Sequence, residues 1–363
     1  MRLNFVAPAR RLVSRKFAST ANLLATTPRP FGGAAFLYTA HARCYNPARK
    51  RSFRGRDTDG ADGSGGFPAA PGPDMGRYAQ QTTIARPVIK TGTGLHTGAR
   101  CIVSLQPAEA NAGVVFAPES GVTIPATADH VVDTQRGTTL GANGSTVGCV
   151  EHLMAALYAF GVDNVRVEVS GPEAPACDGS AREWVELLKE AGVLPLGAGR
   201  RVARLGKVVW AGDESSSAVA APGGSGLALA VAVRFEGTVA DRQSLWLRLT
   251  PRRFAKQIAP ARTFALDREL KGLQEMGLAK GGSGENAFSV GPEGYSGVLR
   301  FQDEVVRHKA LDLIGDLALC GRRFDGLVVA VRPSHRTNVE LARALRAHFE
   351  SAIAQEEAAR SLR

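Results

Sequence analysis

The stretch from Arg300 to Leu317 alternates apolar and polar positions with the period of an α-helix. Its apolar positions share one side of that helix: Val306, Ala310, Leu313, Ile314 and Leu317. His308, Asp312 and Asp316 form a row on the opposite side, each one helical turn from the next. An imidazole and a carboxylate four residues apart point the same way and can share one metal ion. The alternative is a solvated helix face that carries one histidine.

The chain from Gln81 onward predicts two runs of short strands, each followed by helices. In the first half, these signals predict strands at 83–89, 101–105, 113–116 and 164–169, and helices at 148–160 and 181–192. In the second half, they predict strands at 207–210, 227–235, 244–250 and 326–331, and helices at 303–319 and 338–354. Asn143-Gly144 predicts a hairpin turn, and residues 194–199 are expected to link the two halves.

The repetition places His152 and His308 at similar points of two β-then-helix modules. Duplicated modules of this kind pack face to face as two similar α+β layers. The sequence therefore predicts an α+β fold in which the two histidine-bearing helices meet at one interface.

The first 56 residues differ in composition from the rest of the chain. The first acidic residue is Asp57, and twelve lysines and arginines precede it. An acid-free leader rich in Arg, Ala and Ser is typical of an organelle transit peptide, most simply a mitochondrial one. A disordered basic arm is the alternative. We expect a disordered linker at 57–80, a first α+β domain at 81–198 and a second at 199–363.

Charge and cysteine content exclude several classes of protein. The net charge of +11 belongs to the leader, because without those twelve residues the chain holds 33 basic residues against 34 acidic ones. No nucleic-acid partner is predicted, since no basic patch carries interleaved aromatic residues. No apolar run reaches the ~18–20 residues of a membrane span. Five widely spaced cysteines without a CxxC pair favour a reducing compartment and argue against cysteine ligation of zinc.

Glu151 and His152 lie in the first-half helix, whose same side carries small residues: Ala155, Ala156 and Ala159. Alanines suit the close approach of another layer, so the Glu-His pair is expected to be buried. If His152 meets His308 and Asp312, three protein ligands leave a fourth position open, as in a catalytic zinc site. Glu151 would then act on the water there as general base. A structural ion pair between domains is the alternative.

Four further side chains could serve the same centre. His335, in the loop after the strand at 326–331, could protonate a leaving amine as an imidazolium, and Asp316 could hold it charged and oriented. The hydroxyl of Thr263 could stabilise an oxyanion, and Lys309 suits a phosphate or carbonyl oxygen. A surface loop histidine and an exposed lysine are the corresponding alternatives.

Two glycine-rich segments, 91–98 and 280–284, are weak candidates for phosphate binding. Neither ends in the Gly-Lys-Ser/Thr of a Walker loop, and neither fits GxGxxG. Both are expected to form tight turns.

The same residues lie in segments that resemble one family, the UDP-3-O-acyl-N-acetylglucosamine deacetylases, which are zinc amidases of lipid A biosynthesis. The matching segments are 91–98 (Thr-Gly-Thr-Gly-Leu-His-Thr-Gly), 150–153 (Val-Glu-His-Leu), 172–181 (Pro-Glu-Ala-Pro-Ala-Cys-Asp-Gly-Ser-Ala), 261–264 (Ala-Arg-Thr-Phe) and 300–317. They are collinear from about Gln81 to Phe349, and the long block at 300–317 is the most specific of them.

The resemblance implies two ribosomal-S5-like β-α-α-β domains, packed as a layered sandwich with the active site at their interface. It implies one Zn²⁺ per chain with protein ligands at His152, His308 and Asp312. It also implies that Glu151 is the base and that His335, beside Asp316, is the acid. Thr263 would contact the carbonyl oxygen and Lys309 the phosphate side of the substrate. Phe264 and an insert near 263–287 would form the passage for the acyl chain.

Two positions depart from the family pattern. Glu269 stands where the family commonly has an aspartate that contacts nucleotide or sugar, so that substrate contact is less certain. Arg136 stands where bacterial members tend to have an apolar residue near the sugar and acyl chain. The acyl-chain preference therefore stays open.

The sequence as a whole predicts a mitochondrial matrix enzyme that hydrolyses the acetamide of UDP-3-O-[(3R)-hydroxyacyl]-N-acetylglucosamine. The products would be acetate and the UDP-3-O-acyl-glucosamine, in the committed step of lipid A or lipid A-like biosynthesis. We expect a monomer with no transmembrane segment and at most transient contact with a membrane surface. The alternatives are a zinc amidase for another N-acylated amino sugar and a catalytically idle scaffold.

Overall fold

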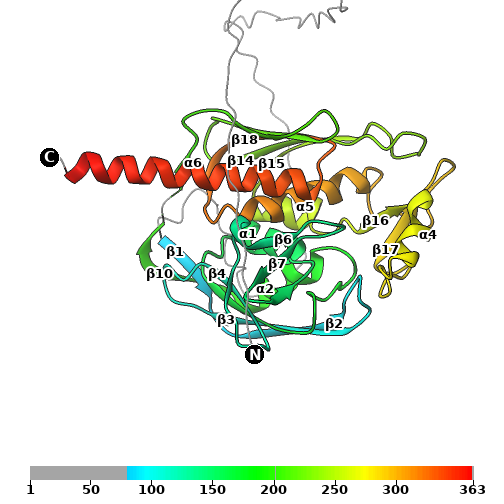
Figure 1. The fold of residues 1–363 in the computed structure, drawn as a ribbon, viewed down its shortest axis with the longest axis horizontal. Helices are drawn as coiled ribbons and strands as arrows, with labels where there is room; N and C mark the ends of the chain where they lie inside the picture. The colour runs from blue at the N-terminus through cyan, green and yellow to red at the C-terminus, as the bar shows by residue number, and fades with distance from the viewer. Residues whose placement is uncertain (1–79, 201, 362–363) are drawn as a thin grey trace, which may run out of the picture. The chain divides into compact units, whose positions relative to one another are not determined.

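Two β-sheets enclose two layers of helices in the part of the chain that the structure describes, residues 80–200 and 202–361 of a computed structural model (Figure 1). The helices of the first half lie on the first sheet and those of the second half on the second. They are α1 (Glu151–Phe160), α2 (Arg182–Ala191), α5 (Glu304–Ala318) and α6 (His335–Ser361). This mixed α+β content agrees with the class expected from the sequence. The expected transit peptide, and all of the expected linker except residue 80, lie outside the described residues.

The first sheet has five strands. In spatial order they are β2 (Val88–Thr93), β3 (Arg100–Pro107), β9 (Val165–Ser170), β4 (Val114–Pro118) and β5 (Ile124–Pro125). In β3, alternate side chains at Cys101, Val103 and Leu105 are fully buried, as a strand with one covered face requires.

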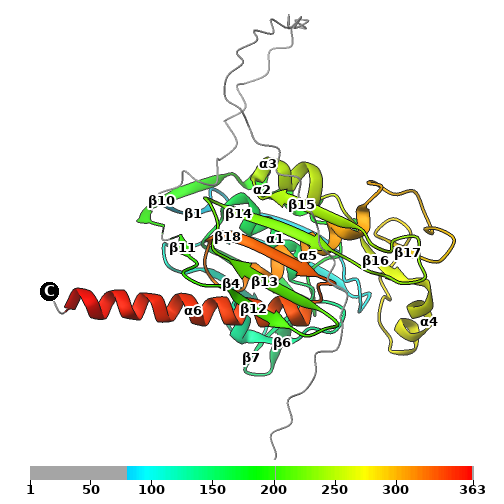
Figure 2. The ribbon, with the colours of Figure 1, turned by 90° about the horizontal axis from the view of Figure 1, so that it is seen from above.

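The second sheet has six strands. Along its main path they are β12 (Val209–Gly212), β13 (Ser217–Ala221), β18 (Phe324–Val331), β14 (Leu227–Ala232) and β15 (Ser244–Arg248), and β11 (Ala203–Arg204) also pairs with β18. Figure 2 shows this sheet from above, with α6 running past β12.

The two sheets repeat one order of pairing. Counted from the first strand of each path, successive pairs are antiparallel, antiparallel, parallel and antiparallel in both sheets. In chain order, α1 comes after β5 and before β9, and α5 comes after β15 and before β18. In both halves the helix therefore precedes the last strand of its sheet. The repetition places α1 and α5 at equivalent points, and the two helices pack against each other.

Gly315 permits the close contact between these two helices. A Cβ at this position would lie 2.0 Å from the backbone oxygen of Glu151, so any side chain would force the helices apart. The alanine side of α1 is completely buried at this contact, as its small residues predicted. The first turn of α1 therefore lies directly against the middle of α5.

Two sequence expectations are wrong at the N-terminal edge. The strand expected at 83–89 is two strands, because Pro87 has no N–H and interrupts the ladder between β1 (Gln80–Ile84) and β2. The linker expected at 194–199 is strand β10 (Val193–Gly199), which pairs antiparallel with β1.

Two smaller sheets carry the loops around the site. One consists of β6 (Val131–Asp133), β7 (Thr139–Ala142) and β8 (Ser145–Val147), preceded by a 3₁₀ turn at Ala128–His130. The hairpin predicted between β7 and β8 is confirmed, because Asn143 (φ 47°) and Gly144 (φ 80°) both adopt the left-handed conformation that such turns require.

The other small sheet pairs β16 (Thr263–Leu266) in parallel with β17 (Ala287–Val290), and α4 (Asp267–Glu275) lies between them in the chain. Figure 1 shows this insert at the side of the molecule opposite the C-terminal end of α6. The short helix α3 (Pro251–Arg253) and a π-helical turn (Phe254–Ile258) precede it. No helix within the described residues is both long enough and apolar enough to cross a membrane.

Candidate active site

The polar row on α5 is buried. His308 is 4 % exposed, Asp312 2 % and Asp316 0 %. The alternative of a solvated helix face is therefore wrong, because α1 and the elements around it cover this side of α5. Buried ionisable groups must be paired, neutral or bound to a ligand.

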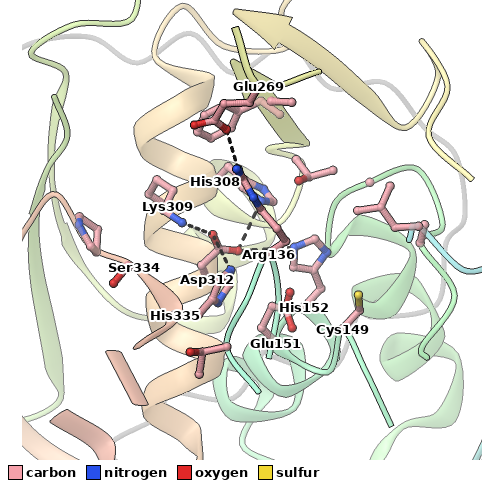
Figure 3. A pocket seen from close by; sticks show the side chains of 18 of the residues that line it. Arg136, Cys149, Glu151, His152, Glu269, His308, Lys309, Asp312, Ser334 and His335 are labelled. Carbon is pink, nitrogen blue, oxygen red and sulfur yellow. Dashed lines mark hydrogen bonds and ion pairs between the residues drawn. The ribbon is translucent and has the colours of Figure 1, made fainter. Parts of the chain in front are cut away.

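His152, His308 and Asp312 converge as the sequence predicted. Their ligand atoms all lie within 4.8 Å of one another. Nε2 of His308 lies 3.3 Å, and Nε2 of His152 3.6 Å, from Oδ1 of Asp312. The two rings stand edge to face with their centroids 5.0 Å apart. Figure 3 shows the three side chains pointing toward one another from α1 and α5.

The donor set suits a metal ion in its protonation states as well as in its geometry. Burial lowers the pKa of His308 to about 4, so this imidazole is neutral at pH 7. Its Nδ1 faces the carbonyl oxygen of Ala261 at 3.1 Å, which leaves Nε2 directed at the cluster. Burial acts to raise the pKa of Asp312, but the charges of His308, Lys309 and His335 hold it well below its usual range.

Asp312 also has an incompletely satisfied carboxylate. Its Oδ1 is buried and, among the described residues, receives no hydrogen bond. An orphaned buried carboxylate oxygen facing two imidazole nitrogens is what a cation of the zinc type would satisfy. The residues present therefore fit a metal ion.

Glu151 lies beside the cluster and is 6 % exposed. Burial raises its pKa, and the charges of His335 and His152 oppose that rise. The backbone N–H of Thr138 donates a hydrogen bond of 3.0 Å to its Oε2. A buried carboxyl with a raised pKa, fixed by a single backbone donor, has the properties of a general base.

His335 belongs to a helix rather than to the loop in which it was expected. It is the first residue of α6, which begins three residues earlier than the predicted helix. Its Nδ1 lies 2.9 Å from Oδ2 of Asp316, as predicted for an oriented imidazole. Burial acts to lower the pKa of His335, but the charges of Asp316 and Asp312 outweigh it and raise the pKa to about 9. His335 is thus an imidazolium at neutral pH, and it is 12 % exposed rather than a surface histidine.

Lys309, Thr263 and Glu269 line the same pocket, which has a volume of about 280 Å³. Lys309 is only 13 % exposed, so the alternative of a solvent-exposed lysine is wrong, and its Nζ lies 2.8 Å from Oδ2 of Asp312. Thr263 opens β16, where its N–H donates to the carbonyl of Gly179. Glu269, on α4, pairs with Arg136 across the pocket.

Phe264 joins this pocket to a second, apolar cavity of about 350 Å³. Its ring packs edge to face on Phe235 and His308 and stacks on Phe288. The insert forms most of the wall of this cavity, whose apolar lining includes Leu270, Leu273 and Phe288. The two hollows share five residues, which come from three segments far apart in the chain: Leu95, Arg136 and residues 263–265.

The sequence did not identify two residues that orient the predicted acid and base. Oγ1 of Thr138 donates to Oδ1 of Asp316 at 2.6 Å, while its N–H binds Glu151. Nδ2 of Asn338 donates to Oδ2 of Asp316 at 2.9 Å. The helical spacing between His335 and Asn338 was a usable signal for the second, but nothing in the local sequence marked Thr138.

The glycine-rich segment 91–98 is explained by a third unpredicted residue, Glu173. Its buried carboxylate accepts hydrogen bonds from the backbone of His96 and from both the backbone and the hydroxyl of Thr97. A Cβ at Gly94 would lie 2.2 Å from that carboxylate. The last residues of the segment therefore form a tight turn, as expected, while its beginning belongs to β2.

Comparisons with known proteins agree with this geometry. A family model described as LpxC, UDP-3-O-acyl N-acetylglycosamine deacetylase, matches residues 81–347. A protein of Anaeromyxobacter dehalogenans (strain 2CP-C) named UDP-3-O-acyl-N-acetylglucosamine deacetylase is 45% identical over 268 residues, which cover 72% of this chain and 85% of the relative.

Two further relatives carry the same name. The protein of Thermosynechococcus vestitus is 41% identical over 76% of this chain and 98% of its own length. The protein of Chlamydia caviae is 40% identical over 72% of this chain and 95% of its own length. Because both the family model and these relatives span most of the described residues, the chain belongs to the LpxC family of UDP-3-O-acyl N-acetylglycosamine deacetylases.

Proposed function

We propose that this protein hydrolyses the acetamide of UDP-3-O-[(3R)-hydroxyacyl]-N-acetylglucosamine, releasing acetate and the free amine. The reaction is the committed step of lipid A or lipid A-like biosynthesis. One observation carries the proposal: a metal-type His-His-Asp cluster, a buried carboxyl and an imidazolium converge in one pocket. Relatives named for this deacetylation support the substrate class.

The proposed cofactor is one zinc ion per chain, held by His152, His308 and Asp312. The LpxC family is a metalloenzyme family, and nitrogen and oxygen donors in this number suit zinc with one position left open. At such a site zinc supplies Lewis-acid chemistry, lowering the pKa of water and polarising a carbonyl group.

Glu151 and His335 perform the two proton transfers in the proposed mechanism. Glu151 takes a proton from the attacking water as the water oxygen bonds to the acetyl carbon. His335 donates its proton to the nitrogen as the C–N bond breaks, so the products are acetate and an amine. Asp316 keeps His335 charged and fixes its ring, because the two side chains share a 2.9 Å hydrogen bond.

Thr263 and Lys309 stabilise charge on the substrate in this proposal. The hydroxyl of Thr263 lines the pocket and donates to the carbonyl oxygen as negative charge develops there. Lys309 lies on the flank of α5 beside the ligands, where its ammonium can bind a phosphate or a carbonyl oxygen. Phe264 leads the acyl chain toward the apolar cavity, and Glu269 contacts the sugar or nucleotide side.

The remaining proposals concern the whole chain. We propose that residues 81–198 and 199–363 are two ribosomal-S5-like domains, which the matching strand order of the two sheets supports. We propose that residues 1–56 direct the protein to the mitochondrial matrix and are then removed, and that the mature protein is a monomer. A reporter fused to residues 1–80 should co-localise with a mitochondrial marker; retention in the cytosol or entry into plastids would contradict this.

The deciding experiment measures metal content and deacetylation together, using protein that begins near Gln81. We expect one zinc per chain, turnover of the UDP-acyl-sugar, loss of turnover on chelation and its return with zinc. If the protein binds zinc but does not turn over this substrate, the metal site stands and the substrate assignment is wrong. Failure to bind zinc after reconstitution would contradict the proposed mechanism.

A further inference from the structure

Arg136 and Glu269 form an ion pair across the mouth of the catalytic pocket. Nη1 of Arg136 lies 2.5 Å from Oε2 of Glu269, and the two residues are 133 positions apart in the chain. Arg136 comes from the loop between β6 and β7, and Glu269 from the first turns of α4. Figure 3 shows the contact between Arg136 and Glu269 as a dashed line near the metal-type cluster.

The pair lies where the catalytic pocket meets the apolar cavity. Both residues line the catalytic pocket, and Arg136 also lines the cavity. Among the described residues that line the cavity, Arg136 is the only arginine, lysine or acidic residue. An acyl chain that extends from the reacting sugar into the cavity would therefore pass the junction that Arg136 borders.

The backbone under the arginine is fixed by the turn at 94–98. Nε2 of His96 lies 3.0 Å from the carbonyl oxygen of Arg136, which adopts a left-handed conformation (φ 65°). The same turn holds the insert, because the N–H groups of Lys280 and Gly281 donate to the carbonyls of His96 and Leu95. The two walls are thus tied together at the base, and the Arg136–Glu269 pair is the side-chain bridge across the top.

Breaking the bridge should cost the fold little free energy. Both side chains are about one-third exposed, at 38% and 31%, and ion pairs of that exposure add little to stability. The aliphatic part of an arginine can cover apolar surface while its guanidinium stays in water. An arginine held in place by a carboxylate is therefore suited to cover a chain that lies across the junction.

We infer that the Arg136–Glu269 bridge is a clasp over the acyl chain and sets the preference for long-chain substrates. The inference rests on the proposed deacetylation. It replaces the sugar or nucleotide contact proposed above for Glu269 with a bridge to Arg136 that acts on the acyl chain. With the bridge closed, the acyl chain at the junction is shielded from water, and the substrate dissociates slowly from the pocket. A substrate whose 3-O-acyl group ends before the junction gains nothing from the bridge.

The test compares kcat/KM for two UDP-N-acetylglucosamine substrates, one with a 3-O-hydroxytetradecanoyl group and one with a 3-O-acetyl group. Arg136→Met keeps the aliphatic stem and removes the charge, and Glu269→Gln keeps the size of its side chain. Each should lower the long-to-short ratio of kcat/KM about fivefold, chiefly through KM of the long substrate. The double exchange Arg136→Glu with Glu269→Arg should restore at least half of the lost preference.

Lys271→Met is the matched control, because Lys271 pairs with Glu275 on the same helix and lines neither hollow. The inference is overturned if the ratio stays at the wild-type value in both single variants. It is also overturned if both substrates lose kcat/KM equally and the double exchange restores nothing, since Arg136 would then contact the nucleotide. Wild-type protein that deacetylates neither substrate would overturn the proposed function itself, an outcome distinct from turnover with an unchanged ratio.

Discussion

His308 and His335 each face an aspartate of α5, one helical turn apart, yet the protein holds them in opposite protonation states. Nε2 of His308 lies 3.3 Å from Asp312, and Nδ1 of His335 lies 2.9 Å from Asp316. Burial acts to lower the pKa of both imidazoles. It prevails at His308, whose pKa is about 4, and is outweighed at His335, whose pKa is about 9.

The difference comes from the charges beyond each pair. His308 also faces His152 and Lys309, which oppose a positive charge on it. His335 faces Asp312 and Glu151 in addition to its own aspartate, and these favour a positive charge. The two aspartates of α5 thus face a neutral donor on α5 that suits a metal ion, and an imidazolium on α6 that suits proton transfer. A His-Asp spacing alone does not decide which of the two a site contains.

The largest expected effect separates the two aspartates. Asp312→Asn should abolish stoichiometric zinc binding and lower turnover by about 10³-fold or more, because it removes a charged ligand. Asp316→Asn is the matched control on the same helix and should retain one zinc. Metal analysis of both purified variants, alongside turnover, tests this. Full zinc content in Asp312→Asn would show that Asp312 is not the aspartate that binds the metal.

Glu151→Gln should leave zinc bound and lower kcat by about 10³-fold, because the amide cannot accept the proton of the attacking water. The amide can still accept the hydrogen bond from Thr138, so the fold should be preserved, as judged by an unchanged melting temperature. Single-turnover rates with stoichiometric zinc give the cleanest measure. Near-normal turnover would remove Glu151 from the mechanism.

His335→Gln should lower kcat by about 10²-fold and remove the alkaline limb of the pH profile. The sign follows from the direction of the shift: an acid with a pKa of about 9 is protonated and active below that pH, and its activity is lost as pH rises through it. In the wild type, kcat should therefore fall above about pH 9. A variant that keeps the same alkaline limb would show that another group supplies the proton.

The smallest effect is expected for Asp316→Asn as a kinetic variant. Removing this charge should lower the pKa of His335, so the alkaline limb should move toward lower pH, with kcat at neutral pH reduced about tenfold. Asn338→Leu removes one hydrogen-bond donor to the same carboxylate but keeps the carboxylate itself, so the limb should move less than in Asp316→Asn. An alkaline limb that stays in place in Asp316→Asn would break the link between this aspartate and His335.

The sequence was sufficient wherever one helix carries the chemistry. The period of α5 placed His308, Asp312 and Asp316 on one side, and the small residues of α1 predicted its close contact with another layer. Family resemblance then assigned the roles. The structure established that His308 and Asp312 share one pocket with His335, which Asp316 contacts.

The sequence was insufficient where partners come from different segments. Thr138 lies 178 positions from Asp316, and no local pattern links them. The start of α6 was missed because Pro333 favours an extended or turn conformation before it, which directs attention to a loop around His335. The strand β10 was read as a linker because Pro195 and its glycines are poor strand formers, and the local sequence does not reveal its pairing with β1.

The missing side chain at Gly315 has a consequence for how this protein can vary. Because the backbones of α1 and α5 touch there, the distance between Glu151 and the ligands on α5 is set by contact between segments 164 positions apart. A substitution that tilts either helix changes that distance, and only a change in the opposite half can restore it. Tolerated changes in the two helices should therefore occur in pairs, and single substitutions from a divergent relative should cost more activity than the complete exchange of both helices.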